Sequence, residues 1–179
     1  MKSPNLIYLS SLFCIFAAHI AANEEKVDNS VQVQSMLAVL YAQSSAEYDA
    51  NNLQTYTGAK LSLDLGLDDK NWTAAIEQKK DFSEKPPAVI LDIDETVLNN
   101  IPFQARAIIK GESYPNGWVD WMLEESSTSV AGVKDFLEYA ELKGVKVFYV
   151  TNRVAIAEEA TRNNLRKLGL PLDEDRDVL

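Results

Sequence analysis

AVILDIDETVLNN, residues 88–100, is an apolar run that ends in three carboxylates within four residues. Pro86 and Pro87 precede it, and prolines end a helix and favour extended backbone. A short continuous apolar run is typical of a strand buried in a parallel sheet. We therefore predict a buried strand at Ala88–Ile93 whose carboxyl end carries acidic side chains into a crevice.

A second apolar run, VKVFYV at residues 145–150, repeats this pattern. An amphipathic helix is predicted before it, at Val133–Leu142, where apolar residues fall on one face. Gly144 stands where a left-handed residue ends such a helix. Another helix is predicted at residues 155–170. The order strand, helix, strand, helix predicts an α/β fold in which helices flank a parallel sheet.

Polar residues follow both predicted strands. Asp92 and Asp94 come at the end of the first strand, and Thr151 and Asn152 come directly after the second. In open parallel sheets the active crevice lies beyond the carboxyl ends of the strands. We therefore expect these four side chains to be neighbours in space.

The two aspartates fit phosphoryl transfer. Asp92 offers oxygen ligands to a hard cation such as Mg²⁺ and an oxygen that can attack phosphorus. Asp94 can protonate the leaving oxygen and then deprotonate the attacking water. The metal would offset repulsion between the anionic nucleophile and the phosphate. Thr151 supplies a hydroxyl, and backbone N–H groups around it can hold phosphate.

Helices are expected in most of the remaining chain. The spacing of apolar residues predicts two helices between Ser35 and Leu65, with a break near Asp49–Asn52. Asp69 is expected to cap a third, short helix that includes Trp72 and Ile76. Further helices are predicted around Phe103–Ile109 and Trp118–Leu123, and residues 124–132 are predicted to form a loop.

The first 22 residues have the pattern of a secretory signal peptide, with cleavage expected after Ala22. Lys2 supplies the basic start, and the apolar stretch Leu6–Ala18 is shorter than the roughly 20 residues of a membrane span. We therefore predict no stable transmembrane span, with an uncleaved anchor or a buried helix as the alternatives. Cys14 and His19 are the only cysteine and histidine. Cleavage would leave a mature chain that acts without either residue type.

The charge balance is acidic. The chain has 17 basic and 27 acidic residues, and loss of Lys2 leaves 16 basic residues and a net charge of −11. Such a balance disfavours a surface that binds a nucleic acid polymer through its phosphates. A small phosphorylated substrate held together with a metal ion remains compatible with it.

These motifs resemble those of the haloacid dehalogenase (HAD)-like phosphatases. Their first motif, an apolar strand followed by Asp-x-Asp-x-Thr, matches Asp92, Asp94 and Thr96, and their second motif matches VFYVTNR with Thr151. LDIDETVLNN, GVKVFYVTNR and the helical segment QSSAEYDA are similar to the bacterial class C acid phosphatases, a family that includes an outer-membrane lipoprotein acting as a 5′-nucleotidase. The resemblance covers nearly all of the predicted mature chain.

The resemblance implies Mg²⁺-dependent hydrolysis of phosphomonoesters in the periplasm or at the cell surface or outer membrane. Asp92 would be the nucleophile that forms an aspartyl phosphate and a metal ligand. Asp94 would be the general acid and base and would give the metal its backbone carbonyl. Thr151 and Asn152 would contact the phosphate.

The sequence departs from the family pattern at three places. Phe103 stands where family members usually carry Tyr, and Val130-Ala131-Gly132 replaces Pro-Gly-Ala. The family's later Lys and its Gly-Asp-x-x-x-Asp motif have no counterpart before Leu179. We therefore expect a C-terminally truncated chain with an incomplete sheet, too few metal ligands and little activity. A non-catalytic protein that binds phosphate or another ligand is the alternative function.

Alternatives also remain for single features. Asp92 and Asp94 could form an exposed acidic turn, part of a calcium loop or a glycosyltransferase metal motif. Trp118, Trp121 and Phe103 are candidates for stacking on a nucleobase or aryl group, and packing within a small helical cap is the other interpretation.

We divide the chain into three parts. Residues 1–22 are the predicted signal peptide, and residues 23–85 form an N-terminal helical region. Residues 86–179 form a partial HAD-like phosphatase core, in which a cap is inserted at about residues 99–130.

Overall fold

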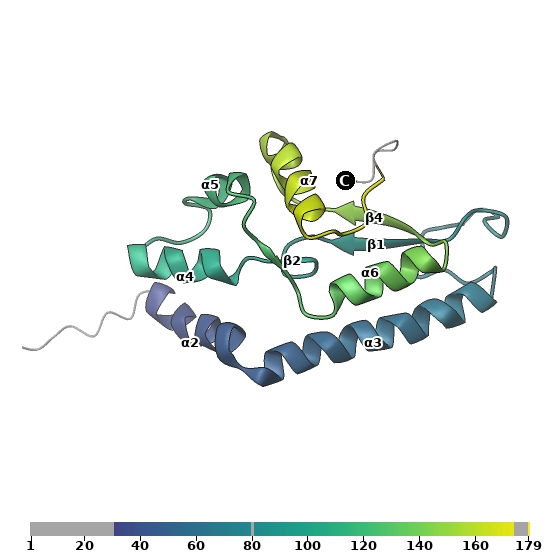
Figure 1. Cartoon of the computed structure of the whole chain (residues 1–179), viewed down its shortest axis with the longest axis horizontal. Coiled ribbons are helices and arrows are strands. Elements are labelled where there is room, and N and C mark those ends of the chain that lie inside the picture. Colours follow the sequence, from purple (N-terminus) through teal and green to yellow (C-terminus); the bar gives the residue numbers. More distant parts are fainter. Residues whose placement is uncertain (1–30, 80, 174–178) are drawn as a thin grey trace, which may run out of the picture. The chain divides into compact units, whose positions relative to one another are not determined.

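Two long helices and a small α/β unit make up the part of the chain that the structure describes (Figure 1). The structure is a computed structural model, and it describes residues 31–79, 81–173 and 179. The predicted signal peptide, with Cys14, lies outside the described residues. The elements in chain order are α2 (Val31–Ser44), α3 (Ala46–Asp68), β1 (Ala88–Asp92), β2 (Leu98–Asn99), α4 (Ile101–Lys110), α5 (Trp118–Leu123), β3 (Thr128–Ser129), α6 (Val133–Leu142), β4 (Lys146–Val150), the 3₁₀ turn η1 (Ala155–Ala157) and α7 (Glu158–Lys167).

The two predicted strands pair in parallel, which confirms the expected α/β fold. β1 lies beside β4 with Ala88 opposite Lys146 and Asp92 opposite Val150. Alternate side chains point to opposite faces of a sheet, and here one face is buried, including Leu91 and Tyr149. On the other face Ile90 is 68% exposed. The helices therefore cover one face of this strand pair.

Helix α6 packs on the buried face because its apolar residues recur at helical spacing. Its buried side chains are Val133, Phe136, Leu137 and Ala140. Val133, Phe136 and Leu137 join Leu91 and Val147 of the strands in one hydrophobic core. As predicted, Gly144 follows the helix in the left-handed region, with φ of 73°.

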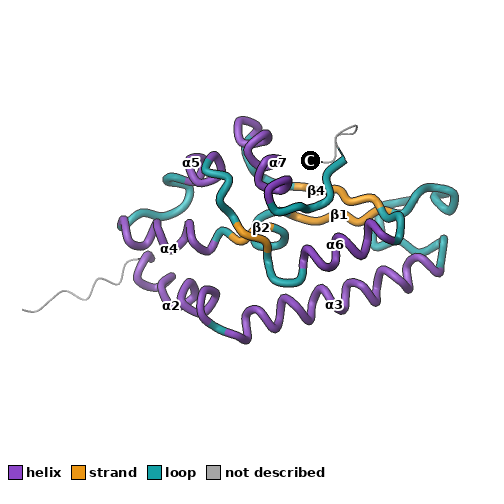
Figure 2. The backbone as a smooth tube through the Cα atoms, in the orientation of Figure 1, coloured by secondary structure: helices purple, strands orange, loops and turns teal. Residues whose placement is uncertain are grey.

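Helix α3 runs along α6 (Figure 2). The rings of Tyr56 and Phe136 lie 5.7 Å apart between the two helices. Nearer the C-terminal end of α3, Asp64 accepts a hydrogen bond from the Tyr139 hydroxyl and forms an ion pair with Lys143. These two donors lower the pKa of the Asp64 carboxyl, with Tyr139 the larger cause. The contacts join the N-terminal helices to the α/β unit.

Tyr56 also connects α3 to the loop after β1. Its hydroxyl donates to the carbonyl oxygen of Thr96 at 2.7 Å, although the two residues are 40 positions apart. Gly132 sits close against the same tyrosine, since a Cβ added there would lie 3.2 Å from the Tyr56 Cβ, and its φ is 87°. Both features favour glycine at position 132, where the pattern Pro-Gly-Ala described above has alanine.

Two short strands bracket the predicted cap. β2 pairs with β3 in antiparallel register, Leu98 opposite Ser129. The segment between them contains α4 and α5, close to the helices expected there. Sequence analysis predicted only a loop for residues 124–132, because a two-residue strand has no periodicity to detect.

Two predictions for the N-terminal region are wrong. The break between the first helices falls at Ser45, whose side chain accepts from the Glu47 backbone N–H and caps α3, and not near Asp49–Asn52. No helix forms at residues 69–79 of the described chain. There Asp69 accepts from the backbone N–H of Asn71 and Thr73 from that of Ala75. Such local side-chain bonds compete with helix formation.

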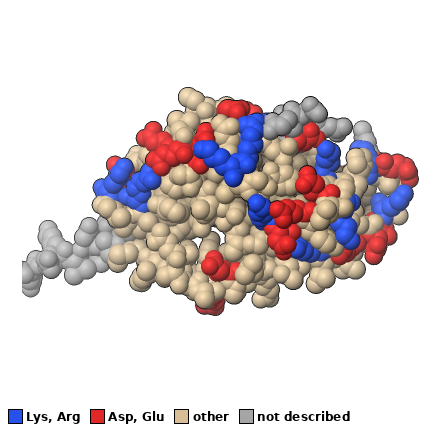
Figure 3. Space-filling view, viewed as in Figure 1, with Lys and Arg blue, Asp and Glu red and all other residues tan. Residues whose placement is uncertain are grey.

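The visible surface carries charges of both signs. In Figure 3, Lys and Arg side chains lie beside Asp and Glu along the upper part and the right side of the face, while much of the lower left carries few charges. Within the described residues, none of the helices combines the length and the apolar character that crossing a bilayer requires.

Replacing Tyr56 by Phe should lower the free energy of unfolding by about 1 kcal/mol, because the Thr96 carbonyl loses its donor. Chemical denaturation followed by circular dichroism measures the change. Tyr41→Phe is the matched control, since Tyr41 is 42% exposed and its replacement should leave stability unchanged. Equal stability of the Tyr56 and Tyr41 variants would contradict the role of this hydrogen bond.

Candidate active site

The loops that follow β1 and β4 meet at the carboxyl edge of the strand pair. Asp94 lies two residues after β1, and Thr151 lies directly after β4. The Thr151 hydroxyl is 3.3 Å from Oδ2 of Asp94, within hydrogen-bond distance. The structure thus brings one residue of each predicted motif together, although they are 57 positions apart in the chain.

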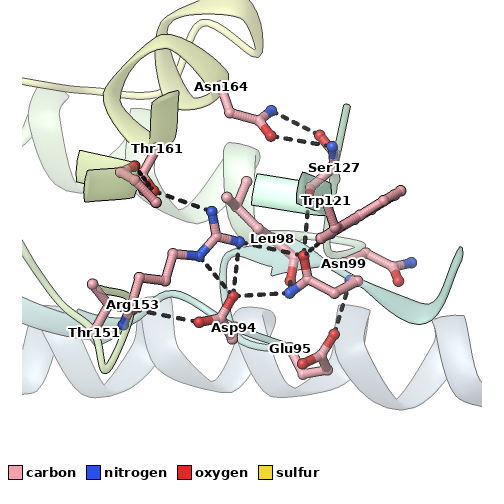
Figure 4. A network of polar contacts seen from close by, with 12 residues as sticks. Asp94, Glu95, Leu98, Asn99, Trp121, Ser127, Thr151, Arg153, Thr161 and Asn164 are labelled. Carbon is pink, nitrogen blue, oxygen red and sulfur yellow. Dashed lines mark hydrogen bonds and ion pairs between the residues drawn. The ribbon is translucent and has the colours of Figure 1, made fainter. Parts of the chain in front are cut away.

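Asp94 is held mainly through its other oxygen. Oδ1 accepts hydrogen bonds from Nε and Nη2 of Arg153 at 2.9 and 2.8 Å. It also accepts one from Nδ2 of Asn100 at 2.9 Å. Figure 4 shows two nitrogens of Arg153 directed at the same carboxylate oxygen of Asp94. Charge-assisted bonds of this kind are the stronger class of protein hydrogen bond, so they fix the orientation of the Asp94 side chain.

Asn100 is the centre of a buried polar network. The residue is 0% exposed, and its side-chain oxygen accepts from Nε1 of Trp121 and from the hydroxyl of Ser127, both at 2.9 Å. Ser127 is held in turn by Asn164, whose amide bonds both its backbone N–H and its carbonyl. The predicted cap and α7 are therefore linked to Asp94 through one amide side chain.

Arg153 has contacts beyond Asp94. Its side chain is only 2% exposed. Nη1 donates to the hydroxyl of Thr161 at 3.1 Å, and Nη2 lies 3.3 Å from the Asn100 oxygen. The guanidinium also lies over the ring of Trp118, 5.5 Å from its centroid, a cation–π geometry. A buried cation needs such partners, because an isolated one would pay a large desolvation penalty.

Asp92 has a different environment from Asp94. It is the last residue of β1 and is exposed. The Thr96 hydroxyl donates to its Oδ2 at 3.2 Å, which positions the carboxylate. One aspartate is thus open to solvent and the other is held within the network.

Glu95 lies in the turn between β1 and β2 and stabilises it. It has a positive φ of 58°, and its backbone N–H donates to the carbonyl of Leu98. Its side chain accepts from the backbone N–H of Asn100 at 2.8 Å. The residue as a whole is exposed, but the carboxyl group turns toward this partly buried bond, and desolvation raises its pKa. Glu95 has a structural role in the turn.

The two predicted phosphate-binding residues differ in their surroundings. Thr151 is partly buried, and its hydroxyl accepts from the backbone N–H of Arg153 at 3.1 Å. Asn152 is exposed between them. The backbone N–H of Arg153 is therefore occupied by Thr151 in this structure, while Asn152 faces solvent.

The three aromatic residues predicted for stacking do not form one ligand-binding wall. Phe103 and Trp121 are each 3% exposed, so neither offers a face to a ligand, and for these two residues the burial supports the other interpretation, packing within the cap. Trp121 is buried because its indole N–H bonds Asn100 and its ring packs near Phe103. Trp118 is partly exposed and lies 6.0 Å from the ring of Tyr114. It is the one aromatic of the three that a ligand could reach.

A metal ion would find oxygen donors here. Within the described residues, no group of three His, Cys, Asp or Glu side chains is arranged to hold a metal. The exposed Asp92 carboxylate nevertheless fits the preference of Mg²⁺ for oxygen ligands. Since Asp94 Oδ1 is occupied by Arg153 and Asn100, Asp94 would contribute its backbone carbonyl, as the resemblance implies.

Sequence reasoning missed Arg153 and Asn100. Each stands next to a recognised motif, Arg153 two residues after Thr151 and Asn100 six residues after Asp94. That proximity was the available signal. The hydrogen bond between Arg153 and Asn100 joins residues that are 53 positions apart in the chain. A local sequence pattern does not predict such a contact.

Comparisons with known proteins agree with the resemblance. The family model for the HAD superfamily, subfamily IIIB (acid phosphatase), matches residues 14–178. The chain is similar to the class C acid phosphatase from Bacillus anthracis, at 35% identity and a TM-score of 0.71. It matches that enzyme's tungstate-bound structure at 34% identity and the same TM-score. In both, 83% of this chain aligns, and it spans 58% of the length of the solved chain.

Replacing Asn100 by Leu should destabilise the fold by about 2–4 kcal/mol, because the buried donors of Trp121 and Ser127 lose their acceptor. Thermal unfolding and near-ultraviolet circular dichroism, which reports Trp packing, measure the effect. Asn116→Leu is the control at an exposed position between α4 and α5. Similar melting temperatures for the two variants would show that the network contributes little to stability.

Proposed function

The chain belongs to the acid phosphatases of HAD subfamily IIIB, and we propose that it hydrolyses phosphomonoesters through an aspartyl-phosphate intermediate. Asp92 is the proposed nucleophile and Asp94 the proposed general acid and base. The observation that carries this assignment is the contrast between the two carboxylates that follow one another at the end of β1. Asp92 is exposed, and Asp94 is fixed with Oδ2 toward the Thr151 hydroxyl.

In the first step a carboxylate oxygen of Asp92 attacks phosphorus, and the bond from phosphorus to the ester oxygen breaks. Asp94 donates a proton to the departing oxygen, so an alcohol leaves instead of an alkoxide. Thr151 and Asn152 contact the phosphoryl oxygens from the neighbouring loop. The hydroxyl and amide groups of these residues suit an anionic group.

In the second step water attacks the phosphorus of the aspartyl phosphate. Asp94, now ionised, accepts a proton from this water, and the bond between phosphorus and Asp92 breaks. Phosphate leaves and the Asp92 carboxylate is restored. One residue serves as acid and then as base, so the proposed mechanism requires no histidine.

A divalent metal is part of the proposal, as is general for HAD phosphatases, and we assign it as Mg²⁺. The Asp92 carboxylate and the backbone carbonyl of Asp94 would hold it. When bound, it supplies positive charge that offsets repulsion between the nucleophile and the phosphate. The oxygen-only donor set supports Mg²⁺ over softer metals.

The proposed substrates are small phosphomonoesters, with 5′-nucleotides as the first class to test. Trp118 supports this choice, because it is partly exposed and lies beside Tyr114, which is 63% exposed. The tungstate in a similar structure is a tetrahedral oxyanion like phosphate. We further propose secretion by the N-terminal segment 1–22 to the periplasm, cell surface or outer membrane, on the basis of the sequence alone.

Replacing Asp92 by Asn should abolish turnover of p-nitrophenyl phosphate in the full-length protein, because an amide is a far weaker nucleophile than a carboxylate. The rate of nitrophenol release, measured by absorbance, tests it. Asp173→Asn is the control, since Asp173 accepts a hydrogen bond from Lys146, which is the first residue of β4 and lies at the opposite end of the strand from Thr151. Near-normal activity of the Asp92 variant would exclude it as the nucleophile.

Removing divalent metal with EDTA should reduce this activity by at least about tenfold, since the Asp92 and phosphate charges would then repel each other. Adding Mg²⁺ in excess should restore it, while Ca²⁺, which prefers longer bonds and more ligands, should restore less. Activity that persists after dialysis against EDTA would contradict the metal requirement.

A further inference from the structure

We propose that Arg153 is a positioning residue that, together with Asn100, binds one oxygen of Asp94 and leaves the other to carry the proton. This inference rests on the proposed function, in which Asp94 is the acid and base. Arg153 is not among the residues that the two motifs predict for the site, which are Asp92, Asp94, Thr151 and Asn152. It acts through Asp94.

The two oxygens of Asp94 have unequal partners. Oδ1 receives three N–H donors between 2.8 and 2.9 Å, two of them from Arg153. Oδ2 has one longer contact, at 3.3 Å, to the Thr151 hydroxyl. An oxygen surrounded by three donors has no lone pair well placed for another proton. The proton that Asp94 gives and takes is therefore carried by Oδ2.

The position of Arg153 argues against direct binding of substrate phosphate. Its side chain is 2% exposed, so an incoming phosphate cannot reach the guanidinium without displacing neighbours. Its guanidinium makes four hydrogen bonds, to Asp94, Asn100 and Thr161. The planar fork matches a carboxylate in a way that a lysine ammonium does not. Trp118 lies over one face of the group.

These contacts also fix where Asp94 points. Asn100 is fully buried and bonded to Trp121 and Ser127, and Thr161 belongs to α7 and is 1% exposed. The two residues therefore hold Arg153 between the predicted cap and α7. Catalysis by proton transfer depends on such alignment, because small displacements of the acid reduce the rate strongly.

The test compares leaving groups in the full-length protein with Mg²⁺. Arg153→Gln should slow hydrolysis of an alkyl phosphate, such as glycerol phosphate, by roughly 10–100-fold, because its leaving oxygen needs a proton from Asp94. Hydrolysis of 2,4-dinitrophenyl phosphate, whose leaving group needs no proton, should fall only severalfold. KM should change little for either substrate. Arg153→Lys should lie between Arg153→Gln and the native protein.

The matched control is Arg106→Lys. Arg106 also lies over a tryptophan ring, that of Trp121, and pairs with a carboxylate, that of Glu124, but it has no contact with Asp94. It should leave both rates unchanged. Equal losses on the two substrates, or a KM raised tenfold or more in Arg153→Gln, would overturn the proposal and indicate phosphate binding by Arg153.

A double-mutant cycle separates positioning from general loss of structure. If Arg153 acts through Asp94, adding Arg153→Gln to Asp94→Asn should cost far less on the alkyl phosphate than it costs in the native protein. Full additivity would contradict the inference. Thermal unfolding of each variant verifies that the folded protein is being compared.

A spectroscopic measurement tests the contact without catalysis. The ¹⁵N–¹H signal of Arg153 Nε should be protected from solvent exchange and should shift or lose protection in Asp94→Ala. Rapid exchange in the native protein would overturn the proposal. If the native protein hydrolyses neither substrate, the proposed function fails, and this measurement still decides whether Arg153 binds Asp94.

Discussion

The ion pair between Arg153 and Asp94 is the interaction on which the rest of the site depends. It joins the loop after β1 to the loop after β4, and its cation is almost fully buried. The Asp94 side chain is 24% exposed, so the pair is only partly buried, but removing Asp94 would still leave the buried Arg153 charge without its carboxylate partner. A buried charge needs hydrogen-bond partners, and the surrounding polar side chains supply them. Asn100 completes the donors to Asp94 and Thr161 accepts from Arg153, so that the buried charge has satisfied neighbours.

The parallel pairing of β1 and β4 makes that contact geometrically available. Because both strands end at the same edge, Thr151 and Arg153 come within hydrogen-bond distance of Asp94, although they follow it by 57 and 59 positions in the chain. Helix α3 adds a second constraint from outside the sheet, through the bond from Tyr56 to the Thr96 carbonyl. The loop after β1 is therefore fixed by contacts from the loop after β4, from Asn100 and from Tyr56 of α3. Asp92, where the loop begins, remains exposed to a ligand. The proposed two-step phosphoryl transfer needs a fixed geometry for Asp94, the proposed acid, and access for Asp92, the proposed nucleophile.

Periodicity and motif spacing were sufficient to predict β1, β4, α6, the parallel arrangement of the two strands and the proximity of Asp94 to Thr151. They failed where a local side-chain bond decides the backbone, as at Ser45 and Asp69, and where an element is too short to have a period, as in β3. They left Trp121 open between ligand stacking and packing within the cap, and its buried indole N–H, which bonds Asn100, supports packing. Arg153 was missed because its role depends on a partner in another loop. The proximity of Asp94 to Thr151 could thus be predicted from the sequence, and the long-range contacts that hold Asp94 in place could not.

The central claim is that the carboxylate of Asp92, beside the fixed Asp94, receives the phosphoryl group. Borohydride reduces an aspartyl phosphate to homoserine, so quenching the full-length protein with borohydride during steady turnover of a phosphomonoester, followed by peptide mass spectrometry, tests it most directly. The account predicts homoserine at position 92 only when substrate and Mg²⁺ are both present. An unmodified Asp92 during rapid turnover, or homoserine at another aspartate, would contradict it.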